Sequence, residues 1–333
     1  MNKTVQALAA AAIAAALAGP AVADDIETIN FGIISTESQQ NLRGQWDPFL
    51  AAMEEKTGYK VKPFFASDYA GVIEGMRFGK VDVAWYGNKS AMEAVDRANG
   101  EVFVQTVDVS GNPGYWSLIL APADSKLESL DDLLTCDGTL NFGIGDPNST
   151  SGYLVPMTFI FAKNGIDPKT CFKTVRNANH ETNALAVANG QVDAASNNTE
   201  NLARIEQNNP EAFKKIKIIW KSPLIPADPI VWRKDLPDAA KEKIRTFFLT
   251  YGTDDSDGDV EAERDVLAGL AWAPFRASSD AQLLPIRVME LSKEIALTQG
   301  DGSLSDEAKA KKVAELEAQQ AAYQDEIAAQ PQN

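Results

Sequence analysis

The sequence has few of the side chains that bind metals or carry positive charge. Its 333 residues include one histidine and two cysteines, which are too few soft ligands for a structural zinc site. After residue 23, no apolar run approaches the roughly 20 residues that a membrane-spanning helix requires. Lys and Arg number 31 against 47 Asp and Glu, which gives a formal net charge of −16. This acidic balance disfavours nucleic acid and anionic membranes as partners.

The first 23 residues have the pattern of a secretory signal peptide. Lys3 precedes an alanine-rich apolar stretch, which ends in the sequence Ala-Val-Ala at Ala23. This pattern predicts export, with cleavage after Ala23. Because no cysteine lies at the cleavage point to carry a lipid, we expect a free periplasmic protein.

The prediction of export bears on the two cysteines, Cys136 and Cys171. Exported proteins fold under oxidising conditions, in which a pair of cysteines commonly forms a disulfide. Two separate buried thiols are the alternative.

Short apolar runs alternate with amphipathic stretches along the chain. For example, apolar residues recur at helical spacing over residues 40–56, directly after an apolar run. Strands that alternate with helices predict mostly parallel sheets covered on both faces, and two such units predict an α/β protein with two lobes. The predicted strands are residues 30–36, 61–65 and 81–87 in the first unit and 140–146, 172–175, 192–197 and 216–220 in the second.

Two extended segments, residues 115–122 and 221–232, are placed to pass between these units. The second segment is rich in proline, which fixes φ and disfavours helix. We therefore expect two α/β sandwich lobes joined by a two-segment hinge. The expected organisation is residues 24–120 plus 230–333 for lobe 1, with a helical tail at about 304–330, and residues 121–229 for lobe 2.

The sequence GDPNSTSGYLVP, residues 145–156, places three hydroxyl residues together at a predicted helix start. Either Asn148 or Ser149 is a suitable N-cap. Such a helix start has free backbone N–H groups and partial positive charge, so together with the hydroxyls of Ser149, Thr150 and Ser151 it favours a phosphate-like anion. The alternative is a well-capped helix whose spare hydroxyls face water.

The same stretch lacks the motifs of nucleotide-binding and hydrolytic enzymes. A Walker A loop needs a lysine after its glycines, and a nucleophile elbow needs Gly-x-Ser-x-Gly. His180 could serve as a base for a serine, but no second motif supports that function. We therefore expect a binding protein rather than an enzyme, with no cofactor.

Several stretches together resemble the periplasmic phosphonate-binding proteins of bacterial ABC uptake systems. They include FGIISTESQQNL, FFASDYAGVIEGMRFGKVDVAWYGN, GNPGYWS, GDPNSTSGYLVP, NHETNALAVANGQVD, NNTENL and KSPLIPADPIVWRK. The resemblance covers nearly all of the chain after residue 23 and becomes loose beyond about Gln299. It implies a type II periplasmic-binding-protein fold. It also implies capture of phosphonates, in particular 2-aminoethylphosphonate, for delivery to an ABC permease of the inner membrane.

The resemblance also implies a role for eight residues of this chain, and no position departs from the family pattern. Those matching the phosphonate-binding positions are Tyr69, Ser149, Thr150, Ser151 and His180; those matching the amino-group and cavity positions are Tyr115, Glu200 and Asp228. Trp85 and Tyr86 are expected behind them. Each of these residues also has an ordinary structural interpretation, as a core aromatic, a helix cap or a turn acid.

Other ligands and another class of protein stay open as alternatives. The same scaffold could bind phosphite, phosphate or another oxyanion, none of which has an ammonium group to place against Glu200 and Asp228. An exported hydrolase is the more distant alternative. If His180 binds the anion as imidazolium, affinity should fall as the pH rises through the pKa of the ring.

The C-terminal tail has a pattern of its own. Apolar residues recur there at three- and four-residue spacing within an Ala-, Glu-, Lys- and Gln-rich helix. This pattern predicts a seam that could pair two chains as a homodimer or dock on the chain's own lobe. The seam residues are Val313, Leu316, Gln320, Tyr323 and Ile327.

Overall fold

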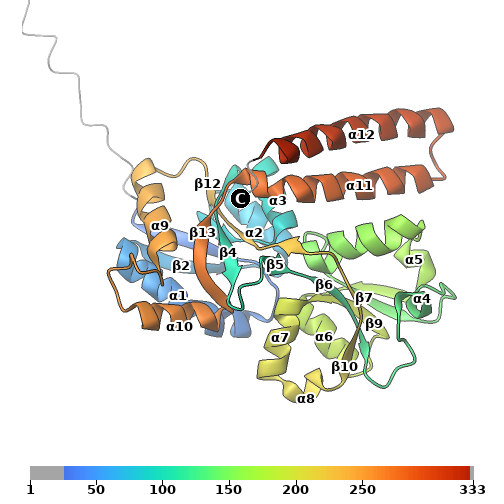
Figure 1. Ribbon diagram of the computed structural model, residues 1–333, viewed down its shortest axis with the longest axis horizontal. Coiled ribbons are helices and arrows are strands. Elements are labelled where there is room, and N and C mark those ends of the chain that lie inside the picture. Colours follow the sequence, from blue (N-terminus) through green and yellow to red (C-terminus); the bar gives the residue numbers. More distant parts are fainter. Residues whose placement is uncertain (1–25, 331–333) are drawn as a thin grey trace, which may run out of the picture.

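The structure, a computed structural model, describes residues 26–330. It has two lobes, each built on one sheet with helices packed around it, and a hairpin of two long helices near the C-terminus (Figure 1). The expected two-lobed α/β fold is therefore confirmed. The predicted signal peptide lies outside the described residues. No helix within residues 26–330 is both long and apolar enough to span a bilayer.

Lobe 1 contains a six-stranded sheet with both parallel and antiparallel pairs. β1 pairs in parallel with β2 and with β3, as the alternating pattern predicts. β12 pairs antiparallel with β3 and β4, and β13 pairs antiparallel with β4. The strand order is β13-β4-β12-β3-β1-β2, with bounds β1 Thr28–Ile33, β2 Lys60–Phe65, β3 Val83–Trp85, β4 Gly100–Asp108, β12 Pro229–Arg233 and β13 Trp272–Ala277.

Lobe 2 contains a five-stranded sheet that is also mixed. β7 pairs in parallel with β8 and β9, whereas β6 pairs antiparallel with β9 and β10. The expectation of mostly parallel sheets is therefore wrong. The chain enters β6 and β12 directly from the segments between the lobes, without the crossover helix that a parallel pair needs. The order is β10-β6-β9-β7-β8, with bounds β6 Ser117–Pro122, β7 Asn141–Ile144, β8 Thr174–Asn177, β9 Ala194–Asn198 and β10 Ile216–Lys221.

The first helix of lobe 1, α1 (Gln39–Thr57), follows the predicted spacing closely. Ser38 Oγ accepts a hydrogen bond from Asn41 N at its start, and Gly58, at φ 74°, ends it in the left-handed conformation that glycine favours. Its buried face is Leu42, Trp46, Phe49, Leu50 and Met53. The other helices of this lobe before the C-terminal hairpin are α2 Tyr69–Arg77, α3 Asn88–Arg97, α9 Asp238–Thr250 and α10 Val260–Gly269.

In lobe 2, the helix whose start is predicted within residues 145–156 has unusual turns. It comprises two π-helical segments, η1 (Thr150–Leu154) and η2 (Met157–Phe161), and a 3-10 turn, η3 (Ala162–Asn164). Another helix of this lobe begins at His180, where Asn179 caps it by accepting from Thr182 N. The remaining helices are α4 Leu130–Leu133, α5 Pro168–Cys171, α6 His180–Ala188, α7 Thr199–Asn208 and α8 Pro210–Phe213.

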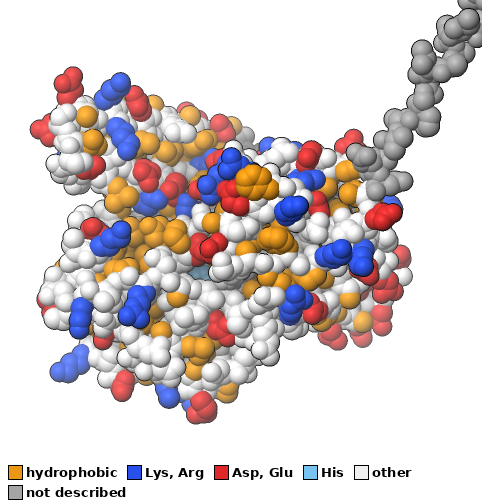
Figure 2. All heavy atoms as spheres, turned by 180° about the vertical axis from the view of Figure 1, so that it is seen from behind, with side chains coloured by type: hydrophobic (Ala, Val, Ile, Leu, Met, Phe, Trp, Pro, Cys, Tyr) orange, Lys and Arg blue, Asp and Glu red, His pale blue; other side chains and the backbone are white. Residues whose placement is uncertain are grey.

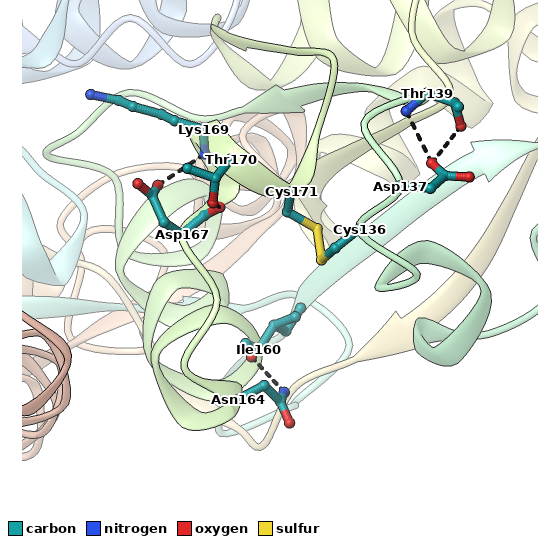
Figure 3. The surroundings of a disulfide bond; sticks show 9 residues. All are labelled: Cys136, Asp137, Thr139, Ile160, Asn164, Asp167, Lys169, Thr170 and Cys171. Carbon is teal, nitrogen blue, oxygen red and sulfur yellow. Dashed lines mark hydrogen bonds between the residues drawn. A yellow bond between two sulfur atoms is a disulfide. The ribbon is translucent and has the colours of Figure 1, made fainter.

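Cys136 and Cys171 form a disulfide within lobe 2, with 4.1 Å between their Cα atoms (Figure 3). The bond ties the loop after α4 to the end of α5. Of the two alternatives for these cysteines, the structure has the pair.

Two segments connect the lobes, and they pair with each other. β5 (Gly114–Tyr115) and β11 (Ile225–Pro226) form a short antiparallel ribbon between the two sheets. Because β6 already belongs to the sheet of lobe 2 from Ser117, we propose to move the first lobe boundary from residue 120 to about residue 116. The second boundary stays near residue 229, where β12 begins in the sheet of lobe 1.

The C-terminal hairpin comprises α11 (Leu284–Gly300) and α12 (Asp306–Ala329), which follow the 3-10 turn η4 (Asp280–Leu283). The two helices run side by side (Figure 1). Gln320 Nε2 donates to Val288 O at 3.1 Å and to Ser292 Oγ at 2.7 Å, so the predicted seam packs on α11 of the same chain. The homodimer prediction thus loses the free surface on which it depended.

Candidate ligand-binding site

All eight residues that the resemblance implicates line one enclosed cavity between the lobes, together with six others. The free space left for water in this cavity is only about 10 Å³, so the two lobes are nearly closed over these side chains. Its lining is Ile34, Thr36, Tyr69, Trp85, Gly87, Tyr115, Ser149, Thr150, Ser151, His180, Asn198, Glu200, Arg204 and Asp228.

The cavity lies where strands end and helices begin. In lobe 1, β1 and β3 run in parallel towards it, and in lobe 2, β7 and β9 do the same. Helices α2, α3, η1, α6 and α7 start at or beside its wall. Each helix start carries partial positive charge and unpaired N–H groups, so the converging starts favour an anion.

The hydroxyl corner, Ser149, Thr150 and Ser151, forms the lobe 2 side of the cavity, and each of its residues is 2% exposed. Ser149 is the N-cap, and its Oγ accepts from Gly152 N at 3.0 Å. Ser151 Oγ accepts from Asn198 Nδ2 at 3.1 Å. The alternative, a capped helix with spare hydroxyls in water, is therefore wrong for this corner.

The two lobes touch directly at this corner. Lys89 N, in the first turn of α3, donates to Thr150 Oγ1 at 2.8 Å across the cleft. Tyr69 N, at the start of α2, donates to Asp146 Oδ2 at 3.1 Å. Burial and the nearby Asp146 carboxylate raise the pKa of Tyr69 well above its usual value, so this phenol stays a hydrogen-bond donor.

His180 is the first residue of α6 and is buried at 3% exposure. Its Nε2 lies 3.4 Å from Ser149 Oγ and 3.4 Å from Asn198 Nδ2. Burial, helped by the positive charge of Arg204, lowers the pKa of His180 to about 4. The protein's own groups therefore keep the ring neutral near pH 7, which argues against the imidazolium that the sequence left open.

The same cavity also contains two carboxylates, Glu200 and Asp228. Tyr115 OH donates to Asp228 Oδ1 at 2.9 Å, and Asn88 Nδ2 lies 3.4 Å from the same oxygen. Burial raises the pKa of Asp228 well above its usual value, and the charge of Glu200 raises it further. Burial also raises the pKa of Glu200, although the charge of Arg204 opposes this. A cation beside these two carboxyls would favour their ionised form and so oppose the effect of burial.

Sequence reasoning missed Thr36, Asn198 and Arg204, which also line the cavity. Asn198 had a local signal, because it is the N-cap of α7 and accepts from Asn201 N at 2.7 Å. Arg204 lies one helical turn after Glu200, so i to i+4 spacing could have placed both on one face. Thr36 belongs to a loop and had no periodic signal.

The predictions for Trp85 and Tyr86 have different outcomes. Trp85 lines the cavity, whereas Tyr86 lies in the core of lobe 1, where its OH donates to Val72 O at 3.0 Å.

Within residues 26–330, three buried polar atoms of the cavity-lining residues have no hydrogen-bond partner: Thr36 Oγ1, Trp85 Nε1 and His180 Nδ1. Buried polar atoms normally have a partner in the protein or in ordered water, so these three are available to a ligand or to water.

This combination of a two-lobed α/β fold and a closed polar cavity between the lobes defines a type II periplasmic substrate-binding protein. The chain matches the family model for the periplasmic phosphonate substrate-binding protein of ABC transporters over residues 31–283. It belongs to this family.

Several relatives document the match. The chain is 57% identical over 304 residues to the phosphonates-binding periplasmic protein of Escherichia coli, covering 91% of this chain and 88% of that protein. It is 55% identical to a binding-protein component of a phosphonate ABC transporter from Pseudomonas aeruginosa, with a TM-score of 0.88 and coverage of 91% and 99% of the two chains. It is 31% identical to a phosphate-import protein of Mycolicibacterium smegmatis, covering 67% and 71%.

Proposed function

We propose that the chain captures aminoalkylphosphonates, with 2-aminoethylphosphonate as the best ligand, and delivers them to an ABC permease of the inner membrane. The observation that carries this proposal is the position of Glu200 and Asp228 in the same closed cavity as the hydroxyl corner. A ligand with an anionic head and a cationic group would find donors for the first and carboxyls for the second in that cavity.

The phosphonate head would bind at the hydroxyl corner. Its three oxygens can accept hydrogen bonds from the hydroxyls there, from the Tyr69 phenol and from a neutral His180 through one N–H. All of these donors are uncharged, and the converging helix starts add partial positive charge. These neutral groups would hold the phosphonate oxygens, and the positive charge of Arg204 in the cavity lining would add to their effect.

The ammonium end would bind between Glu200 and Asp228. A cation there stabilises both carboxylates in their ionised form and offsets their burial. A ligand of the same shape without the amine leaves these carboxyls without a partner, which costs binding free energy. The acids therefore supply selectivity, and the hydroxyl corner supplies affinity for the common head.

Calorimetric titration with matched ligands tests the proposal. We expect 2-aminoethylphosphonate to bind the wild type more tightly than ethylphosphonate, methylphosphonate or phosphate. Glu200→Gln is expected to weaken 2-aminoethylphosphonate at least about 30-fold and to change ethylphosphonate by less than about threefold. The matched control is Glu211→Gln, an exposed acid of the same lobe.

Phosphate, phosphite or another oxyanion is the second candidate, because one relative is named as a phosphate-import protein. If phosphate binds the wild type most tightly, or if Glu200→Gln weakens all of these ligands equally, this candidate replaces the first. An exported hydrolase would instead convert a phosphonate or phosphate ester during prolonged incubation. We further infer that the mature periplasmic protein starts after Ala23, which mass spectrometry of secreted material tests.

A further inference from the structure

We propose that Glu37 and Arg204 form a latch across the cleft that closes the lobes on every ligand alike. This inference rests on the proposed capture of a ligand between closing lobes. Under this proposal, Glu200 and Asp228 determine which ligands bind more tightly than others. The latch raises the affinity for every ligand by one common factor.

The two residues of the latch come from different lobes. Glu37 lies in the loop between β1 and α1 of lobe 1, and Arg204 lies on α7 of lobe 2. Arg204 Nε donates to Glu37 Oε1 at 2.5 Å. Since opening the cleft moves α7 away from that loop, the contact can exist only in the closed state.

The carboxylate of Glu37 is held in place from both sides. Gln45 Nε2, on α1 of its own lobe, donates to Glu37 Oε2 at 2.9 Å. Asn201 Nδ2, on α7 of the other lobe, lies 3.4 Å from Oε1. The carboxylate is therefore positioned to receive Arg204, which lowers the entropy lost when the pair forms.

The latch differs from the other ion pairs in its enclosure. Charged side chains of both signs lie scattered over the face in Figure 2, and most ion pairs within residues 26–330 include an exposed partner. The side chains of Arg204 and Glu37 are only 12% and 3% exposed, which makes theirs the most enclosed pair of the described residues. Low exposure strengthens the attraction between the two charges and limits screening by salt.

A neighbouring contact docks the same loop. Glu181, in the first turn of α6 in lobe 2, accepts from Ser38 N at 2.7 Å and from Asn41 Nδ2 at 2.6 Å. Together, Glu37 and Glu181 attach the start of α1 to two helices of the other lobe. None of these cross-lobe hydrogen bonds uses a ligand atom, so they favour closure whichever ligand is bound.

The positive charge of Arg204 gives Glu37 a second role, which is to neutralise that charge beside the carboxyls proposed to bind the ligand's ammonium group. Arg204 lines the cavity near Glu200 and Asp228, where an unpaired guanidinium would repel an ammonium ligand. Glu37 neutralises that charge from the far side of the cleft. The pair as a whole is neutral, and this neutrality suggests a clean test.

The test is the double variant Glu37→Gln/Arg204→Gln, which removes the latch and keeps the net charge. We expect it to weaken 2-aminoethylphosphonate and ethylphosphonate by the same factor, about fivefold, in calorimetric titration. Each single variant should lose more affinity than the double variant, at least about 30-fold for one of the two ligands. The reason is that a single substitution leaves one buried charge unpaired. The matched control is Glu211→Gln/Lys214→Gln, an exposed pair within lobe 2, which should change neither affinity.

The outcomes separate the latch from the proposed function. Failure of the proposed function is seen in the wild type alone, as tighter binding of phosphate than of 2-aminoethylphosphonate. The latch is read from the ratio of variant to wild-type affinity for any ligand that binds. A double variant that folds and binds every ligand as tightly as the wild type would overturn the latch, as would a loss confined to the amine-bearing ligand. Small-angle scattering adds a second readout, since the saturated double variant should keep a larger open fraction than the saturated control.

Discussion

Burial sets the charge of the individual side chains in the cavity. It lowers the pKa of His180 to about 4 and raises the pKa of Glu200 and Asp228. All three shifts move the groups towards their neutral forms, as desolvation requires. A zwitterionic ligand reverses this tendency at one end, where its ammonium keeps the carboxylates ionised, and accepts neutral donors at the other.

The lowered pKa of His180 predicts how stability changes with pH. Between about pH 6.5 and pH 4, the unfolded chain binds a proton at His180 and the folded chain does not, so the folded state loses stability as the pH falls through this window. The wild type should therefore lose about 2 kcal/mol of unfolding free energy relative to His180→Gln between pH 7 and about pH 4.5. Urea titrations of both proteins at several pH values measure this difference. Parallel pH curves for the two proteins would show that His180 titrates normally.

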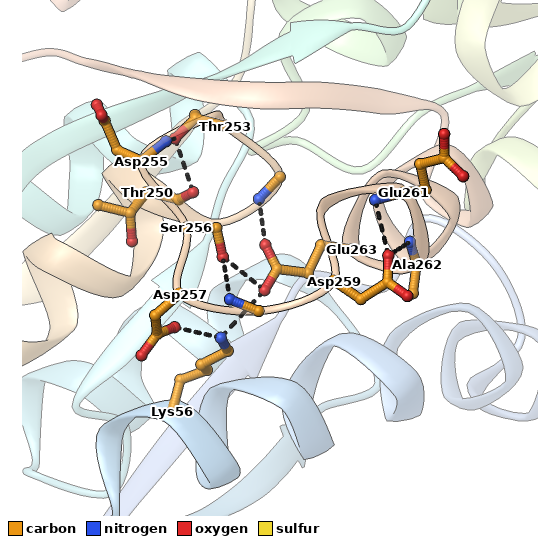
Figure 4. A network of polar contacts seen from close by, with 12 residues as sticks. Lys56, Thr250, Thr253, Asp255, Ser256, Asp257, Asp259, Glu261, Ala262 and Glu263 are labelled. Atoms are coloured by element: carbon orange, nitrogen blue, oxygen red, sulfur yellow. Dashed lines mark hydrogen bonds and ion pairs between the residues drawn. The ribbon is translucent and has the colours of Figure 1, made fainter.

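At the scale of secondary-structure elements, one polar network holds the loop before α10 against the end of α1 (Figure 4). Glu263 accepts from Gly252 N at 2.7 Å, from Ser256 Oγ at 2.7 Å and from Lys56 Nζ at 3.2 Å. Burial alone would raise the pKa of Glu263, but these donors outweigh it and lower the pKa below the usual value.

Glu263→Gln is therefore expected to destabilise lobe 1 at neutral pH by about 1–2 kcal/mol, because two charge-assisted hydrogen bonds are lost. The lowered pKa of Glu263 determines how this stabilisation depends on pH. The stabilisation is present above the usual carboxylate pKa and disappears as the pH falls through the folded-state pKa. Thermal melts at neutral and acidic pH measure it. Glu261→Gln, an exposed acid of the same helix, is the control, and an equal effect of both variants would contradict the role of the network.

Elements with strong local signals could be predicted from the sequence. The spacing of Leu42, Trp46 and Phe49 predicts α1, and the hydroxyl corner with its N-cap predicts a helix start near Ser149. The antiparallel strands β6 and β12 were not predictable in this way, because their direction depends on how the chain crosses between the lobes. The C-terminal seam is a second example, since periodicity identifies an apolar face of the helix but not the surface that packs on it.

At the scale of the whole molecule, the site exists only because two lobes meet. Tyr69 comes from lobe 1 and His180 from lobe 2, and the contact between Lys89 N and Thr150 Oγ1 spans the cleft. The family resemblance named eight lining residues correctly as neighbours. It did not lead to Thr36, which lies in a loop without a periodic signal, or to Arg204, which only its i to i+4 spacing from Glu200 indicates.

The central claim is that a phosphonate head binds at the hydroxyl corner while its amine lies between Glu200 and Asp228. A crystal structure of the chain with 2-aminoethylphosphonate tests it most directly. The account predicts phosphonate oxygens within hydrogen-bond distance of the Ser149, Thr150 and Ser151 hydroxyls, and the ligand nitrogen within hydrogen-bond distance of both carboxylates. A ligand bound in the reverse orientation, or a nitrogen remote from both acids, would contradict it.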